Sequence, residues 1–227
     1  MDFEFTEEQL GLRDNARSVL AAKCPPSVVR AVYEGGATGE EMWAALVELD
    51  WPAIGIREEH GGLGLGFIEV GIVVEELGRV VAPSPFLATL TQLAPMLREA
   101  GATALLPRIA DGSCTGTLAL AEGGVWRLDA VATTARRTGT GWVLDGVKSH
   151  VLDGATAEEL AVVARLGGTT GGDGVGAFLV PGAAVSAQPH AVIDPTMPLA
   201  SVVLDGAEVG TDRVLLEPGD PDAPGAI

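Results

Sequence analysis

The chain has 227 residues, of which 47% are hydrophobic, and its 31 acidic and 14 basic residues give a formal net charge of −17. This charge repels phosphate backbones and anionic lipid, so nucleic acid and membrane surfaces are excluded as expected partners. No apolar run approaches the ~20 residues of a membrane-spanning helix. The two cysteines, Cys24 and Cys114, form no close pair. We therefore expect a cytoplasmic protein without a disulfide framework.

The first two helices are predicted from capping boxes. Thr6 and Gln9 form the first box, and the run Cys24-Pro25-Pro26 ends that helix because proline lacks the N–H for the next hydrogen bond. Thr38 and Glu41 form the second box.

Three further helices are expected at positions 67–79, 85–100 and 102–110, where apolar residues recur at helical spacing. Pro95 lies inside the second of these and should bend or interrupt it. The pattern predicts an all-helical N-terminal domain over residues 1–113.

After Ser113 the sequence changes to short β-rich runs separated by turn residues. The runs are 115–121, 130–137, 141–148, 160–165, 176–181, 191–193 and 201–204. Short strands at this spacing are typical of an antiparallel β-sandwich or barrel. The fold class is therefore α+β, with a β domain over residues 114–216 and a tail at 217–227 that has no core pattern.

Most catalytic motifs are absent. The glycine-rich run at 61–66 has no GxGxxG register and follows a helix, so a flexible turn is favoured over a dinucleotide site. His60, His150 and His190 lie in separate segments without a second ligand at helical or strand spacing, and no metal site is expected. Glu75 and Glu76 form an acidic pair that is more often a solvated helix face than a functional site.

Five stretches nevertheless occur in an order that is typical of one enzyme family. They are EEHGGLG at 58–64, VEELG at 74–78, LALAE at 118–122, WVLDGVKSHVLDG at 142–154, and DPT at 194–196 followed by VVLDGAEV at 202–209. In this order they resemble the acyl-CoA dehydrogenase family, whose β domain carries strands usually written ALTEP and YxLNGxKxWITNG. The resemblance covers nearly the whole chain.

The resemblance implies FAD as cofactor and an acyl-CoA thioester as substrate, in fatty acid or steroid side-chain metabolism. A base takes the α-proton while hydride passes from Cβ to the flavin. It also implies an electron-transfer partner for the reduced flavin and a homo- or hetero-oligomer. The family's catalytic glutamate comes from a third, C-terminal helical domain. The sequence ends at Ile227 before such a domain, and we match no catalytic residue.

The motif positions also imply which residues contact the flavin. Leu120 and Ala121 would touch the pyrimidine side of the ring, and His150, Val151 and Leu152 would lie beside and over it. Ala121 and Leu152 replace two threonines, which removes two hydroxyl donors, although backbone N–H groups can still donate. His150 replaces a tryptophan. If the third domain is missing, we expect an exposed apolar patch around Val151 and Leu152.

Substrate contacts are expected from two places. The resemblance implies that Phe86, Leu87 and Leu90 line the acyl pocket, although core packing explains these residues equally well. Gly124 belongs to a shortened form of the stretch that helps to hold pyrophosphate.

Three functions remain open. The chain is part of an acyl-CoA dehydrogenase, or a non-catalytic binding or scaffolding subunit of the same fold, or a flavin oxidase or monooxygenase.

Overall fold

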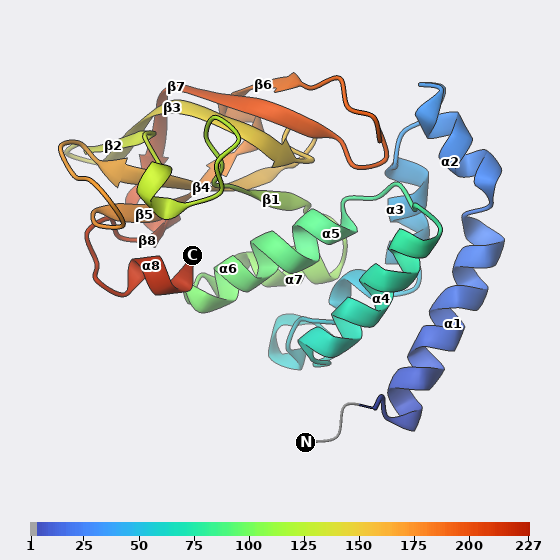
Figure 1. Ribbon diagram of the computed structural model, residues 1–227. Coiled ribbons are helices and arrows are strands. Elements are labelled where there is room, and N and C mark those ends of the chain that lie inside the picture. The colour runs from blue at the N-terminus through green and yellow to red at the C-terminus, as the bar shows by residue number, and fades with distance from the viewer. Residues whose placement is uncertain (1–3) are drawn as a thin grey trace.

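The structure is a computed structural model that describes residues 4–227 (Figure 1). Helices occupy the first half of the chain, and strands occupy most of the second half. The helices are α1 (Glu7–Lys23), α2 (Pro26–Tyr33), α3 (Glu40–Val47), α4 (Phe67–Arg79), α5 (Phe86–Ala88), α6 (Ala94–Glu99), α7 (Leu106–Ala110) and α8 (Ala223–Ala226). None of the helices in this part of the chain is both long and apolar enough to cross a membrane.

The first capping box is confirmed. The Thr6 hydroxyl accepts the N–H of Gln9 at 3.2 Å, and the Gln9 side chain accepts the N–H of Thr6 at 3.0 Å. The prolines after α1 end this helix as predicted. They also begin α2, which was not predicted. Pro26 is tolerated there because the first turn of a helix needs no N–H from it.

The second capping box is wrong. Helix α3 begins at Glu40 after Gly39, and the Thr38 hydroxyl accepts only the N–H of Glu40, at 3.4 Å. A side chain at position 39 would lie 2.9 Å from the carbonyl oxygen of Pro83, so the close approach of the 83–84 turn favours glycine at the helix start.

The predicted helix at 85–100 is continuous but irregular. A π-helical turn, η3 (Thr89–Leu93), separates α5 from α6, and Pro95 lies in the first turn of α6. The helix changes from π-helical to α-helical hydrogen bonding just before Pro95, and the bend or break predicted from Pro95 stays a prediction.

One mixed sheet of eight strands follows, in the order β6-β7-β3-β2-β4-β5-β8, with β1 beside β4. The strands are β1 (Gly116–Ala119), β2 (Thr134–Arg137), β3 (Gly141–Leu152), β4 (Glu159–Leu166), β5 (Val175–Pro181), β6 (Ser186–Pro189), β7 (Leu199–Gly210) and β8 (Val214–Leu216). The predicted fold class, helices followed by a largely antiparallel β region, is confirmed. Two pairings, β1 with β4 and β2 with β4, are parallel, and the sheet formed by residues 4–227 does not close into a barrel.

Three details of the predicted β region are wrong. Positions 191–193 form no strand, and the nearby strand is β6. Strand β8 was missed because it has only three residues. The tail at 217–227 contains α8 and buries Ala223 to 1% exposure, since α8 packs against β5.

Helix and sheet meet at the start of β1. The Thr89 hydroxyl accepts the N–H of Gly116 at 3.1 Å and donates to its carbonyl oxygen at 3.3 Å. A side chain at position 116 would collide with Leu93, so glycine permits this close approach. Figure 1 shows α5 and α6 running along the sheet beside β1. This contact holds the start of β1 against the helices, and the candidate site begins after the other end of β1, at Leu120.

Candidate functional site

The two motif strands meet at what we call the β1–β3 corner, formed by residues 120–124 and 148–152. The Ser149 N–H donates to the carbonyl oxygen of Ala121 at 2.7 Å, and the Gly124 N–H donates to the Ser149 hydroxyl at 3.1 Å. A side chain at position 124 would lie 3.7 Å from the ring of His150. The structure therefore brings Ala121, Gly124 and His150 together.

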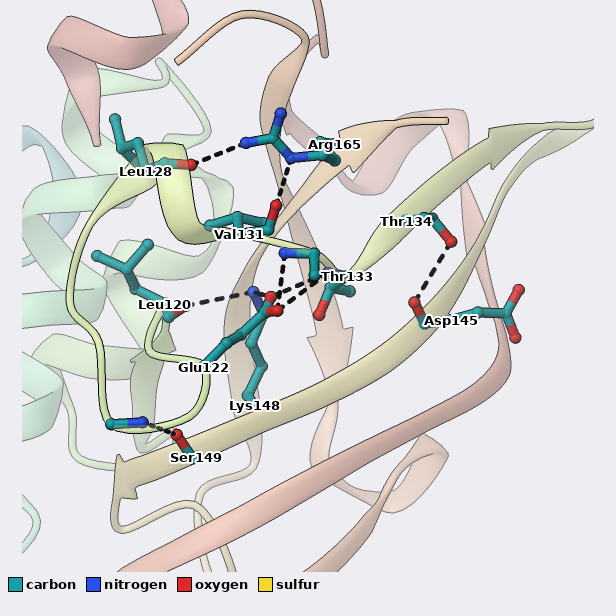
Figure 2. A network of polar contacts seen from close by, with 12 residues as sticks. Leu120, Glu122, Leu128, Val131, Thr133, Thr134, Asp145, Lys148, Ser149 and Arg165 are labelled. Atoms are coloured by element: carbon teal, nitrogen blue, oxygen red, sulfur yellow. Dashed lines mark hydrogen bonds and ion pairs between the residues drawn. The ribbon is translucent and has the colours of Figure 1, made fainter. Parts of the chain in front are cut away.

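A buried ion pair holds the corner (Figure 2). Lys148, which is 0% exposed, donates through Nζ to Glu122 at 2.5 Å and to the carbonyl oxygen of Leu120 at 3.3 Å. Glu122 also accepts the N–H groups of Ala132 at 2.7 Å and Thr133 at 3.0 Å. One carboxylate thus joins the end of β1, the middle of β3 and the loop before β2.

Both members of this pair are ionised at neutral pH. Burial lowers the pKa of Lys148 to about 8, although the hydrogen bond and charge of Glu122 oppose this. Burial raises the pKa of Glu122, but the hydrogen bond and charge of Lys148 outweigh it and bring this pKa below its ordinary value. The pair is therefore a salt bridge around a buried lysine, with its desolvation offset by two backbone donors to Glu122 and one backbone acceptor for Lys148.

Arg165 holds the same loop from β4. Figure 2 shows its guanidinium between Leu128 and Val131, whose carbonyl oxygens both accept from it. It also donates to the carbonyl oxygen of Gly171 at 2.6 Å. Because its acceptors are backbone carbonyls, Arg165 fixes the loop that presents the Thr133 N–H to Glu122.

The five residues expected at the flavin differ in accessibility. Leu120 is half-buried and His150 is exposed. Ala121 and Val151 are 1% exposed and Leu152 is 7% exposed, so the predicted apolar patch around the latter two is wrong. The pairing of β3 with β7 turns Val151 into the core of the sheet.

His150 is the accessible side chain of the corner. Its backbone has a left-handed φ of 54°, which is unusual for a residue other than glycine. Its ring lies edge-on to that of His190 with centroids 5.3 Å apart, and His190 contacts the Ser201 hydroxyl at 2.8 Å. Contact of these five residues with a flavin stays a prediction. His150 and Leu120 leave side-chain surface accessible, whereas Ala121 and Leu152 lack the threonine hydroxyls of the family motif.

The residues expected at the substrate do not converge. Phe86 is buried in the core, Leu87 lines a cavity of about 200 Å³ with Met197, and Leu90 lines a different cavity of about 420 Å³. Gly124 lies at the corner instead. Their role in substrate binding stays a prediction.

Glu76, the second residue of the acidic pair on α4, forms ion pairs with two arginines. Glu76 is fully buried and accepts from Arg17 at 2.6 Å and from Arg79 at 2.7 Å, so the favoured interpretation of a solvated face is wrong for this residue. The hydrogen bond from Arg17 and, after it, that from Arg79 lower the pKa of Glu76 to about 2. This contact ties α1 to α4.

The motifs at 118–122 and 142–154 contain Glu122 and Lys148, but they do not predict that the two side chains pair. The available signal was the position of Lys148 in phase with Trp142 and Leu144, because side chains alternate between the faces of a strand and a buried cation needs a partner. Over residues 4–227, no cluster of three or more histidine, cysteine, aspartate or glutamate side chains is arranged to hold a metal ion.

The comparisons with known proteins agree with the motifs. A family model described as "Acyl-CoA dehydrogenase, N-terminal domain" matches residues 6–116. The probable acyl-CoA dehydrogenase fadE25 of Mycobacterium leprae is 28% identical over 228 residues, covering 96% of this chain and 58% of that protein. The chain belongs to the acyl-CoA dehydrogenase family. It spans about 58% of the length of the first curated relatives that it matches.

Solved structures of this family share the fold. The ChsE4-ChsE5 complex from Mycobacterium tuberculosis matches with a TM-score of 0.84 and 25% identity, over 99% of this chain and 60% of that chain. The Tcur3481-Tcur3483 steroid ACAD matches with a TM-score of 0.80 and 30% identity, over 97% of this chain and 59% of that chain. An acyl-CoA dehydrogenase of Bacillus anthracis complexed with FAD has the same fold. The match has a TM-score of 0.80 and 22% identity, over 98% of this chain and 39% of that chain.

Proposed function

We propose that this chain supplies the flavin-contacting corner of an FAD-dependent acyl-CoA dehydrogenase. The observation that carries this proposal is the joining of the two motif strands by the buried Glu122–Lys148 pair and the Ser149–Ala121 hydrogen bond. FAD, when bound, would supply the acceptor for the substrate hydride. The solved relative complexed with FAD supports this choice of cofactor.

The chain's own residues would bind and orient the ring. The exposed His150 ring would stack on it or donate to it, and Leu120 would add apolar contact. The Glu122–Lys148 pair would keep the two strands at a constant separation, because a ring held from two sides needs both sides fixed. Gly124 and Ser149 would position the loop beside His150.

The base for the α-proton is proposed to come from a segment or subunit outside residues 1–227, since we match no residue here to it. The ChsE4-ChsE5 complex supports a heteromeric assembly. An acyl-CoA substrate, with a fatty or steroid acyl group, and an electron-transfer partner in the cytoplasm belong to the same proposal. The steroid relative supports the bulkier acyl group.

A second function has its own support. Ala121, Val151 and Leu152 are buried, and two of them lack the hydroxyl that the family motif supplies. These features favour a non-catalytic subunit that keeps the fold and binds a partner without FAD.

Titration of the purified chain with FAD separates the two functions. We expect stoichiometric uptake with a flavin spectrum, and we expect His150→Ala to weaken uptake at least about tenfold because stacking is worth about 1–3 kcal/mol. His60→Ala is the matched control, since His60 lies in another segment, at the 420 Å³ cavity. A colourless chain that ignores FAD favours the non-catalytic subunit. Uptake that is equally weakened by both variants contradicts the site at the corner.

A further inference from the structure

A cavity of about 380 Å³ lies where the turn after β3 meets the helices. Its wall comes from the start of α3, the turn at 83–85, the turn after β3 and the loop at 195–198. None of the residues of the β1–β3 corner lines it. A volume of this size is typical of sites for small organic molecules.

Asp153 is the buried ionisable group of this cavity. It is 7% exposed, with a left-handed φ of 54°. Its N–H donates to the carbonyl oxygen of Pro198 at 2.8 Å, and its own carbonyl oxygen accepts from Thr156 at 2.9 Å. The main chain therefore holds the turn without help from the side chain.

The carboxylate of Asp153 has no partner in the part of the chain that the structure describes. It makes neither a hydrogen bond nor an ion pair there, whereas an aspartate in a turn ordinarily accepts from a nearby backbone N–H. Burial alone raises the pKa of this carboxyl to about 7. A buried carboxylate without a partner is unfavourable, so a ligand that pairs with it would be stabilised.

The surroundings of Asp153 favour a positive ligand. The other ionisable residue of the described lining is Glu40, an exposed carboxylate at the start of α3, and the lining contains neither lysine, arginine nor histidine. Trp43 contributes an aromatic side chain, with its Nε1–H already donated to the carbonyl oxygen of Gly112 at 3.1 Å. Four prolines supply apolar surface. Two carboxylates and an indole attract a cation, and a neutral alcohol would leave the charge of Asp153 uncompensated.

We propose that this cavity binds a small organic cation, a protonated amine on an apolar body. Its ammonium group donates to the Asp153 carboxylate, and its apolar body lies against Trp43 and the prolines. This site does not depend on flavin binding, so its failure and the failure of the proposed function are separate results.

Calorimetry on the full chain tests the chemistry of the ligand. The probes are n-hexylammonium and cyclohexylammonium, with n-hexanol and hexanoate as matched neutral and negative controls. We expect at least one amine to bind, the alcohol to bind at least about tenfold more weakly, and hexanoate not to bind, because a charge-assisted hydrogen bond is the stronger one. Failure of both amines, or equal binding of hexanoate, overturns the proposal.

A pair of variants tests the anchor. Asp153→Asn keeps the shape and tolerates a left-handed φ, so we expect it to fold and to weaken amine binding at least about tenfold. Glu40→Gln removes the exposed carboxylate and should weaken binding by less than about threefold. Equal losses in the two variants would mean that the acidic protein attracts amines without a site.

The pH profile gives an independent readout. The amine stays protonated between pH 6 and pH 8 while Asp153 ionises, so affinity should rise roughly tenfold over this range. The other carboxylates that face the lining are Glu40, Glu158, which accepts from the Thr115 N–H at 3.1 Å, and Asp194, which accepts from the Thr196 N–H at 3.0 Å. Glu40→Gln should keep the rise, and Asp153→Asn should remove it. A flat profile in the unmodified chain contradicts the assignment of Asp153.

Discussion

Two glutamates, the buried Glu76 among the helices and the partly buried Glu122 at the β1–β3 corner, pair with cations in different ways. Glu76 meets Arg17 and Arg79, whose side chains remain 47% and 45% exposed. Glu122 meets Lys148, which is 0% exposed. The arginines keep much of their hydration, whereas the lysine loses its own. The cost of desolvating Lys148 therefore offsets most of its attraction to Glu122, and the second pair stabilises the fold little. We infer that the Glu122–Lys148 pair mainly fixes the geometry between two strands, whereas the contacts of Glu76 with the arginines mainly stabilise the helical part.

The largest effect is expected from Glu122→Ala. This change leaves Lys148 buried without a counter-charge and removes the acceptor for the Ala132 and Thr133 N–H groups. We expect the free energy of unfolding to fall by about 3–5 kcal/mol in urea denaturation. A loss below about 1 kcal/mol would mean that water reaches Lys148 and that the pair is not buried in solution.

A double variant separates geometry from stability at the same corner. Glu122→Leu with Lys148→Met removes both charges at similar volume, and such replacements are often neutral for stability. We expect a free energy of unfolding within about 1–2 kcal/mol of that of the unmodified chain. We also expect faster hydrogen exchange at the Ser149 amide, because the salt bridge no longer helps the Ser149–Ala121 hydrogen bond to hold the end of β1 against β3. Unchanged exchange would show that the pair does not order the corner.

A smaller effect is expected from Glu76→Gln. The amide keeps one acceptor for the arginines but loses the charge, so we expect a loss of about 1–2 kcal/mol in the free energy of unfolding. Glu75→Gln is the matched control on the neighbouring position and should change stability by less than about 0.5 kcal/mol. Equal effects would place the contribution in the helix as a whole rather than in the Glu76 contact.

The difference between these glutamates also marks what local sequence can predict. The Thr6–Gln9 capping box was predicted correctly because its partners are three residues apart. The burial of Glu76 was not, since its main partner, Arg17, is 59 residues away. The parallel pairing of β1 with β4 is likewise non-local.

At the candidate site, the motif order predicted both strands of the corner. The structure places His150 near Gly124 there. The motif order could not give the burial of Val151 and Leu152, because that depends on the register between β3 and β7. The cavity beside Asp153 was missed for the same reason: its wall comes from segments between Val32 and Pro198, and no single stretch of sequence contains it.

The stability contributions of Glu76 and Lys148 should both rise with pH, but in separate pH ranges. The pKa of Glu76 is about 2 in the folded chain and ordinarily 4.5, so its stabilisation is complete above pH 4.5 and lost as pH falls towards 2. The pKa of Lys148 is about 8 and ordinarily 10.5, so the unfolded chain binds more protons between these values and the Lys148 contribution rises with pH there. Urea midpoints across pH 2–10 check both, with Glu76→Gln flattening the acid side and Lys148→Met the alkaline side. Profiles unchanged by these variants would mean that other groups dominate.

The smallest effect is expected from Arg79→Ala. Arg79 lies three residues from Glu76 on α4 and is nearly half exposed, so the pair is worth about 0.5–1 kcal/mol, and Arg17 still satisfies the carboxylate. Its urea midpoint should fall less than that of Glu76→Gln, and 1 M salt should reduce the difference from the unmodified chain because an exposed pair is screened. Lys148→Met should respond little to the same salt, since the Lys148 side chain is fully buried. If salt affected both variants equally, Lys148 would have to be accessible to ions, and the contrast between a hydrated helical contact and a dry corner would be wrong.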